Sequence, residues 1–103
     1  MNIDTLLKQA KKMQDQLSKI TEELATKEVE ASSGGAMVTV KANGKSEITK
    51  ITIDPEAFSL GDKQMLEDMI LAAANEALNR AKELSTEAFK QVSGGINIPG
   101  FPL

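Results

Sequence analysis

The most constraining feature of the sequence is a β-prone run between positions 27 and 54 that two turn signals interrupt. Gly34-Gly35 and Asn43-Gly44 divide this run into three segments rich in Val, Ile and Thr. An Asn-Gly pair between β-prone segments predicts a hairpin, because both positions of the usual two-residue turn need positive φ. We therefore expect a three-stranded antiparallel meander, with strands at 27–33, 36–43 and 46–54.

The third strand breaks its own alternation of apolar and polar residues. Ile51 and Ile53 share one face, whereas Ile48 falls on the opposite face. One explanation is a β-bulge near Thr49-Lys50. The other is a sheet that is partly covered on both faces, by helices on one side and by a partner on the other.

A long helix is predicted on each side of the meander. In the first, at 3–26, apolar residues recur at alternating steps of three and four, a period typical of a coiled-coil seam. Asn2 is expected to cap this helix. We expect the seam to pack on the chain's own second helix, because three heptads with Ala10 among them make a short self-pairing coiled coil. The seam consists of Ile3, Leu6, Ala10, Met13, Leu17, Ile20 and Leu24.

The second helix is predicted at 62–93, with Asp62 as its cap and an alanine-rich apolar stripe. Before it, residues 56–61 form a connector in which we expect Phe58 and Leu60 to be apolar anchors. After it, residues 94–103 form a Gly- and Pro-rich tail that still contains Ile, Phe and Leu. The tail is either mobile or docked on an apolar groove.

These elements predict one α+β domain at 1–93 in which two long helices flank the meander. At 1.5 Å per residue the helices would be about 36 and 46 Å long, more than a compact globule of this size holds. We therefore expect an elongated molecule. If the helices run antiparallel, the start of the first and the end of the second would meet at a distal tip. The chain has no Trp or Tyr and only three Phe, so burial against a second copy would help such a thin core.

The composition argues against catalysis. The sequence has no Cys and no His, which removes thiol chemistry, thiolate metal sites and the usual general base. The adjacent carboxylates of Glu67 and Asp68 diverge on a helix and do not share one site. An oxygen-only metal site at Asp54, Glu56 and Asp62 is conceivable, but acidic helix starts explain these residues more simply. We expect no enzyme activity and no cofactor.

Positive charge gathers in residues 1–20, over most of the first helix, although the whole chain has a formal net charge of −3. Residues 1–20 hold four lysines and two aspartates, a net of +2, whereas residues 54–76 hold six acids and one lysine, a net of −5. The helix dipole disfavours cations near a helix start. Lys8, Lys11 and Lys12 therefore indicate either a solvated lysine face or an anionic partner.

Three stretches together resemble the YbaB/EbfC family of small bacterial nucleoid-associated proteins. They are GGAMVTVKANGKSEITKITIDPE in the meander, LEDMILAAANEALNRAKE in the second helix and GGINIPGF in the tail. The heptad helix that begins at Ile3 fits the resemblance as well. The combination covers nearly the whole chain and is specific, although no single stretch is.

The resemblance implies an α+β protomer that forms a tweezer-like homodimer and binds double-stranded DNA in the cytoplasm, at the nucleoid. It also implies roles in nucleoid organisation and gene expression. No apolar run approaches the length of a membrane span, and no signal-peptide pattern begins the sequence, so we expect no membrane partner. We also expect no small-molecule substrate.

The expected DNA-binding residues come from the charge distribution, because phosphate contacts need local cations rather than a basic net charge. A single arginine among them leaves little capacity for guanine readout, so we expect low sequence specificity. The alternative is a DNA-free protein–protein adaptor that uses the alanine-rich helix, a sheet face and the apolar tail. The expected DNA-binding residues are Lys8, Lys11, Lys12, Lys19, Arg80, Lys82 and Lys90.

Overall fold

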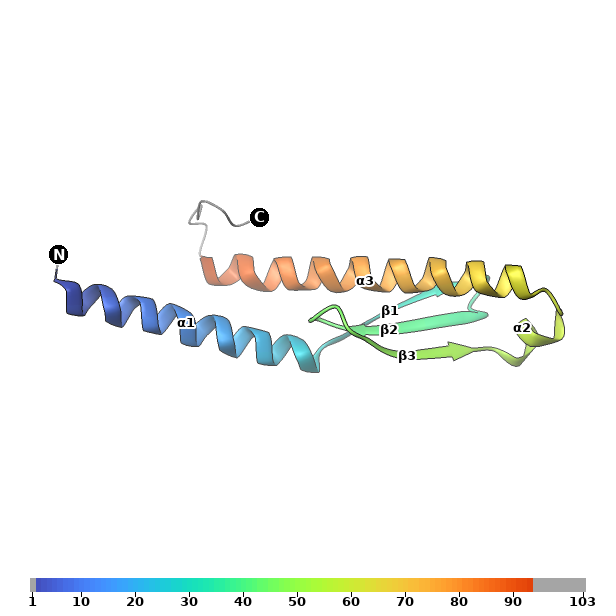
Figure 1. Cartoon of the computed structure of the whole chain (residues 1–103), viewed down its shortest axis with the longest axis horizontal. Helices are drawn as coiled ribbons and strands as arrows, with labels where there is room; N and C mark the ends of the chain where they lie inside the picture. Colours follow the sequence, from blue (N-terminus) through green and yellow to red (C-terminus); the bar gives the residue numbers. More distant parts are fainter. Residues whose placement is uncertain (1, 94–103) are drawn as a thin grey trace.

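The protein is an elongated α+β molecule, as Figure 1 shows. A computed structural model of the chain describes residues 2–93, with side chains up to residue 91; the predicted tail 94–103 lies outside the described residues. The molecule measures 69 × 22 × 16 Å, and its radius of gyration of 19.2 Å exceeds the value of about 13 Å for a compact chain of this length. The elements are α1 (Ile3–Thr26), β1 (Glu28–Ser33), β2 (Val38–Asn43), β3 (Ile48–Ile53), α2 (Pro55–Ser59) and α3 (Lys63–Ser93).

The predicted antiparallel meander is confirmed, with strand order β1-β2-β3. The register shifts between β2 and β3, because Lys41 pairs with Lys50 while the next residue, Ala42, pairs with Ile48. Thr49 is therefore the extra residue of a β-bulge. The bulge returns Ile48 to the face that holds its neighbours on β2, so the bulge explanation of the broken alternation is the correct one.

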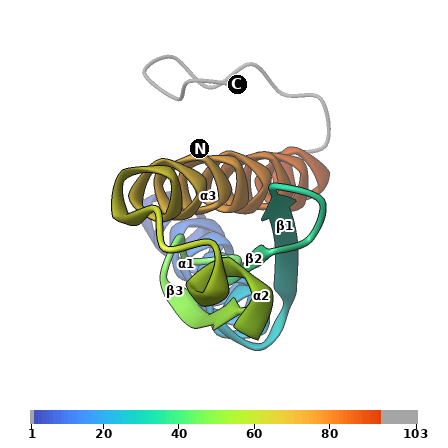
Figure 2. The same ribbon diagram turned by 90° about the vertical axis from the view of Figure 1, so that its right-hand side faces the viewer.

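The core lies between one face of the sheet and α3. Val38, Val40 and Ala42 of β2 are fully buried on that face, against the alanines of α3. Small side chains let the helix backbone approach the sheet closely, and α3 crosses over β1 and β2 while leaving β3 less covered (Figure 2). The buried alanines are Ala73, Ala77 and Ala81.

The β2–β3 turn differs from the predicted two-residue hairpin. Ser46, rather than the Asn-Gly pair, has positive φ at 61°, and its N–H donates to the Asn43 carbonyl at 3.0 Å. This is the three-residue loop in which a left-handed residue follows a β-turn. The Asn43 side chain accepts from Lys45 N and Glu47 N, at 2.9 and 3.1 Å, which stabilises the turn.

Both long helices begin at their predicted caps. Asn2 Oδ1 accepts from Asp4 N at 3.1 Å and begins α1, and Asp62 Oδ1 accepts from Met65 N at 3.0 Å and begins α3. These side chains satisfy backbone donors that a helix start leaves unpaired. The two starts agree with the sequence because capping depends on neighbouring residues only.

The predicted meeting of helix ends at a distal tip is wrong. The two helices run in opposite directions, but α1 extends well past the end of α3 (Figure 1). The last turns of α3, at Ala88 and Gln91, lie beside Ile20 and Leu24 in the second half of α1. The first half of α1 projects alone because most of the length of α3 lies over the sheet.

The connector before α3 also differs from the prediction. It contains the short helix α2, which Asp54 caps through a 2.9 Å bond from Glu56 N. Phe58 and Leu60 are 65% and 53% exposed, so neither is an anchor within the chain, and Ala57 is the buried residue. A helix as short as α2 has only one narrow face towards the rest of the protein, and Ala57 lies on that face.

Candidate nucleic-acid interface

The lysines of α1 lie on the side of the helix that faces away from the apolar seam. At 3.6 residues per turn, Lys8, Lys11, Lys12 and Lys19 lie about 130–170° around the helix from the centre of the seam. All four are exposed. The helical spacing therefore separates an apolar face from a lysine face along one projecting helix.

The lysines of α1 are not neutralised by ion pairs with the aspartates of the same helix. Two ion pairs lie within α3, where Lys63 pairs with Glu67 and Arg80 pairs with Glu76. Asp4 and Asp15 also lie on α1, but neither is paired with a lysine there. Four exposed ammonium groups on a projecting helix are thus available to phosphate oxygens.

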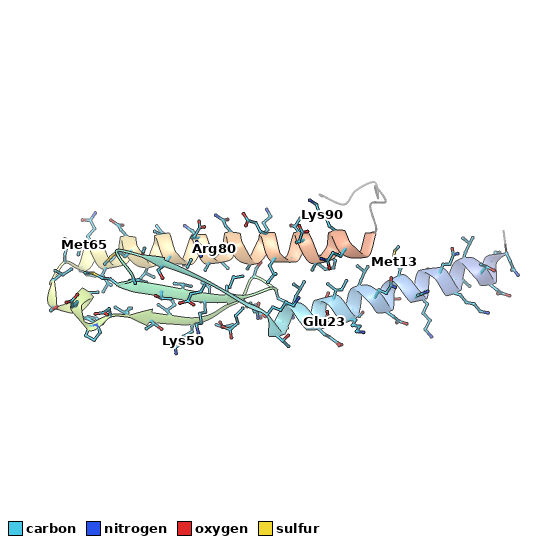
Figure 3. The ribbon with its side chains drawn as sticks, turned by 180° about the vertical axis from the view of Figure 1, so that it is seen from behind. Met13, Glu23, Lys50, Met65, Arg80 and Lys90 are labelled. Atoms are coloured by element: carbon cyan, nitrogen blue, oxygen red, sulfur yellow. The ribbon has the colours of Figure 1, made fainter. Side chains whose placement is uncertain are left out.

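The cations of α3 form a second group that differs in its contacts. Arg80 lies at the side of α3 facing β1, where Nε contacts Glu76 Oε1 at 3.2 Å and one terminal nitrogen donates to the Glu30 carbonyl (Figure 3). These contacts tie α3 to the edge strand β1. Lys82 and Lys90 are exposed on the side of α3 opposite its buried alanines.

The structure does not bring all seven expected residues into one surface. Lys8, Lys11 and Lys12 precede Met13 in α1, and Figure 3 places Met13 just beyond the last turn of α3. Lys90 lies near the end of α3, and Arg80 lies over the sheet (Figure 3). The expected residues therefore form a lysine face on α1 and a separate, smaller group on α3.

A third group of cations was missed by the charge distribution. Lys41 and Lys50 lie directly opposite each other on β2 and β3, on the sheet face away from α3. Lys45 is exposed in the turn that joins these strands. Like charges at opposed positions repel each other unless an anion lies between them. Only the register, including the bulge, brings Lys41 and Lys50 together, so spacing in the sequence did not reveal the pair.

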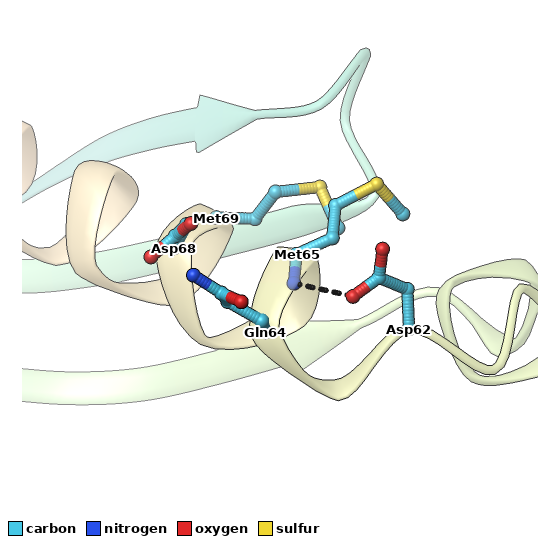
Figure 4. Close-up of a pocket in the computed structure, with 5 residues that line it drawn as sticks. All are labelled: Asp62, Gln64, Met65, Asp68 and Met69. Carbon is cyan, nitrogen blue, oxygen red and sulfur yellow. Dashed lines mark hydrogen bonds between the residues drawn. The ribbon is translucent and has the colours of Figure 1, made fainter.

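The opposite end of the molecule is acidic. A shallow pocket at the start of α3 is lined by Asp62, Gln64, Met65, Asp68 and Met69 (Figure 4). The Asp62 carboxylate caps the helix there, and both carboxylates disfavour a bound phosphate. No group of three metal-binding side chains occurs in the part of the chain that the structure describes. The helices within residues 2–93 are also too polar or too short to cross a membrane.

Comparisons with known proteins match this chain over most of its length. It is 52% identical over 100 residues to a nucleoid-associated protein of Clostridium novyi, covering 97% of this chain and 88% of that protein. It is 46% identical to one of Anaeromyxobacter dehalogenans, with 97% of each chain covered. The crystal structure of an uncharacterized protein from Helicobacter pylori has a TM-score of 0.79 and 26% identity, over 89% of this chain and 98% of that one.

The family assignment follows from a match to a whole-family pattern. The YbaB/EbfC DNA-binding family, which is not an enzyme family, matches residues 1–96. These residues include α1, the sheet and α3, so the match extends over the fold and over every candidate DNA-binding residue. The chain belongs to the YbaB/EbfC DNA-binding family.

Proposed function

We propose that this protein binds double-stranded DNA as a homodimer, mainly through phosphate contacts made by the lysine face of α1. The observation that carries the proposal is that face itself, with Lys8, Lys11, Lys12 and Lys19 exposed on a projecting helix. Family membership supports DNA as the anionic partner. An acidic net charge is compatible with this function because phosphates respond to nearby cations.

Low sequence specificity follows from the types of residue on the interface. Lysine is a point charge that contacts phosphate without distinguishing bases, whereas bidentate guanine readout usually needs arginine. Arg80 is already bonded to Glu76 and to the Glu30 carbonyl. We assign it mainly to holding α3 on β1, with Lys82 and Lys90 as secondary phosphate contacts. DNA shape then sets the remaining preference.

The homodimer is supported by an apolar strip that one chain leaves exposed. Ile48 and Ile51 are 43% and 45% exposed on β3, although they share the sheet face that α3 covers over β1 and β2. Leu71 of α3 is also exposed. Leu71 precedes Arg80 by nine residues, which places the two side chains about half a turn apart around the helix. Because Arg80 contacts β1, Leu71 lies on the side of α3 away from β1 and towards β3.

We assign this β3–α3 strip (Ile48, Ile51 and Leu71) to the dimer interface. β3 is an edge strand, and exposed apolar edges favour pairing with another chain. A twofold dimer that buries the strip leaves both copies of α1 projecting outward. Two such arms form the tweezer-like shape, with a lysine face on each arm.

The biological role follows from DNA binding with little sequence preference. Relatives from Clostridium novyi and Anaeromyxobacter dehalogenans are named nucleoid-associated proteins. We propose the same association for this protein, at the nucleoid in the cytoplasm. Binding at many sites would influence nucleoid organisation and, through it, gene expression.

The test is a titration of the protein onto a fluorescently labelled duplex at several salt concentrations, measured by anisotropy. The arm variant Lys8→Gln/Lys11→Gln/Lys12→Gln is compared with a matched sheet variant, Lys41→Gln/Lys45→Gln/Lys50→Gln. Each loses three positive charges, so the two differ only in where the charge is lost. We expect the arm variant to bind more weakly, with a salt slope lower by about one unit for each lysine removed.

The two variants separate the possible outcomes. A reduced slope in the sheet variant alone would move the interface to the open face of the sheet and contradict the lysine face of α1. No binding of the unmodified protein at about 50 mM salt, where phosphate contacts are strong, would overturn DNA binding. That result would favour the DNA-free adaptor.

A further inference from the structure

The distal half of the α1 seam is apolar and exposed. Ile3, Leu6 and Met13 are 71%, 44% and 41% exposed, whereas Leu24, in the same seam, is 3% exposed. The proximal half packs beside the last turns of α3. No other element within residues 2–93 covers the distal half, which we call the distal seam (Ile3, Leu6, Ala10 and Met13).

This exposure does not fit an ordinary solvent-facing helix. The heptad spacing continues without a break from the packed half into the distal half. An isolated helix of about 14 residues is marginal in water, and helices in proteins gain most of their stability by packing an apolar face. The lysines lie on the far side of α1, so contacts with DNA would leave the distal seam uncovered.

The residues that directly follow α3 have the composition needed to cover such a face. Residues 94–103 contain four large apolar residues, two prolines and no charged side chain. The segment starts where α3 ends, beside α1, and Figure 3 places Met13 just beyond the last turn of α3. An uncharged apolar segment therefore begins next to an exposed apolar seam of the same chain.

We propose that residues 94–103 dock along the distal seam, with Ile96, Ile98 and Phe101 as the contacting side chains. Ten extended residues reach about 33 Å, whereas the seam from Met13 to Ile3 is about 15 Å long. Proline excludes a continued helix and favours an extended conformation, which lies along a helix groove without backbone pairing. The occupant is thus a segment of the same chain.

A second copy of α1 fits the distal seam less well. Only two heptads are exposed, and the central position is Ala10, so paired helices would bury little apolar area. Docking within the chain also needs no association, because the connection to α3 holds the segment close to the seam. Concentration dependence therefore distinguishes the two occupants.

The absence of Trp and Tyr makes a direct test possible. Phe101→Trp creates the only tryptophan of the chain, and its emission and acrylamide quenching report burial without any DNA. We expect blue-shifted, weakly quenched emission that is independent of protein concentration. Adding Leu6→Asp and Met13→Asp to the distal seam should shift the docking equilibrium towards free tryptophan by about tenfold or more, because a docked segment would desolvate both charges. As a control, Phe58→Asp, at an exposed position of α2, should leave the tryptophan emission and its quenching unchanged.

A second measurement separates docking from loss of helix. Far-UV circular dichroism of the Leu6→Asp/Met13→Asp variant checks that α1 persists. Hydrogen exchange of the full chain with Ile96→Asp and Ile98→Asp should show faster exchange at residues 6–13 than in the parent, with the sheet unchanged. Tryptophan emission equal to that of the unfolded chain, or unaffected by the seam substitutions, would overturn the proposal. Burial that disappears on dilution would also overturn it and assign the distal seam to a second copy.

Discussion

Gly44 holds the end of α1 against the sheet through backbone contacts alone. Its N–H lies 2.9 Å from the Leu24 carbonyl and 3.0 Å from the Lys27 carbonyl. A Cβ at this position would lie 2.7 Å from Leu24 Cδ2 and 2.8 Å from the Leu24 carbonyl oxygen. The absence of a side chain, rather than a positive φ, is therefore what this position requires.

We expect Gly44→Ala to destabilise the protein by about 1–3 kcal/mol, because backbone atoms of α1 must move to admit the methyl group. Urea unfolding followed by circular dichroism measures the change. Lys45→Ala, at the next and exposed position, is the control and should leave stability nearly unchanged. A Gly44→Ala protein as stable as the parent would show that the end of α1 adjusts freely.

At the scale of elements, the packing of α3 on the sheet depends on small side chains. Ala73, Ala77 and Ala81 are fully buried against the valines of β2. Because these alanines are fully buried, a longer side chain at their positions has no space between the helix and the sheet. The alanines therefore determine how closely α3 lies on the sheet.

We expect Ala77→Leu to lower the free energy of unfolding by about 2 kcal/mol, since overpacking moves α3 away from the sheet. Ala72→Leu, on the exposed side of the same helix, adds the same atoms and should change stability by less than about 0.5 kcal/mol. Thermal and urea unfolding of the pair isolate the packing effect. Equal stabilities in the two variants would contradict close packing at Ala77.

For the whole molecule, the proposed assembly depends on the β3–α3 strip. Ile51→Asp places a charge in the proposed interface. We expect the dissociation constant of the dimer to rise by at least about tenfold. Thr52→Asp, on the opposite face of β3, is the control. Sedimentation equilibrium reports the mass, which should fall towards the 11.1 kDa of one chain. Because Ile51 is half exposed in the single chain, a circular dichroism spectrum like that of the parent is expected.

Unchanged association of the Ile51→Asp variant would exclude the β3–α3 strip as the dimer interface. The DNA titration would still test the lysine face in that case, because this face is on α1 and not on the β3–α3 strip. A monomeric variant that still binds DNA, but more weakly, would separate the contribution of one arm from that of two.

Several features of this protein depend on near neighbours in the chain and were predicted from sequence. Asn2 and Asp62 cap the long helices, because a cap bonds to backbone within one turn. The three strands follow from β-prone segments between turn residues. The elongated shape follows from helix lengths alone. The lysine face of α1 was also visible in sequence, since helical spacing places its residues relative to the seam.

Other features depend on contacts between distant residues. The bulge at Thr49 was one of two explanations until the pairing of β2 with β3 selected it. The Lys41–Lys50 pair depends on that same register. Phe58 and Leu60 were expected to be anchors from hydrophobicity alone, but the direction of a one-turn helix decides which side chain turns inward.

Spacing along the chain was enough to predict the two long helices, their caps, the three strands, the seam and the charged face, whereas α2 was not predicted. The place of α3 along the sheet, and hence how far α1 projects beyond it, became known from the folded arrangement. That position depends on the buried alanines of α3, which pack against the valines of β2. Packing of this kind joins residues far apart in sequence, and no local pattern specifies their relative position.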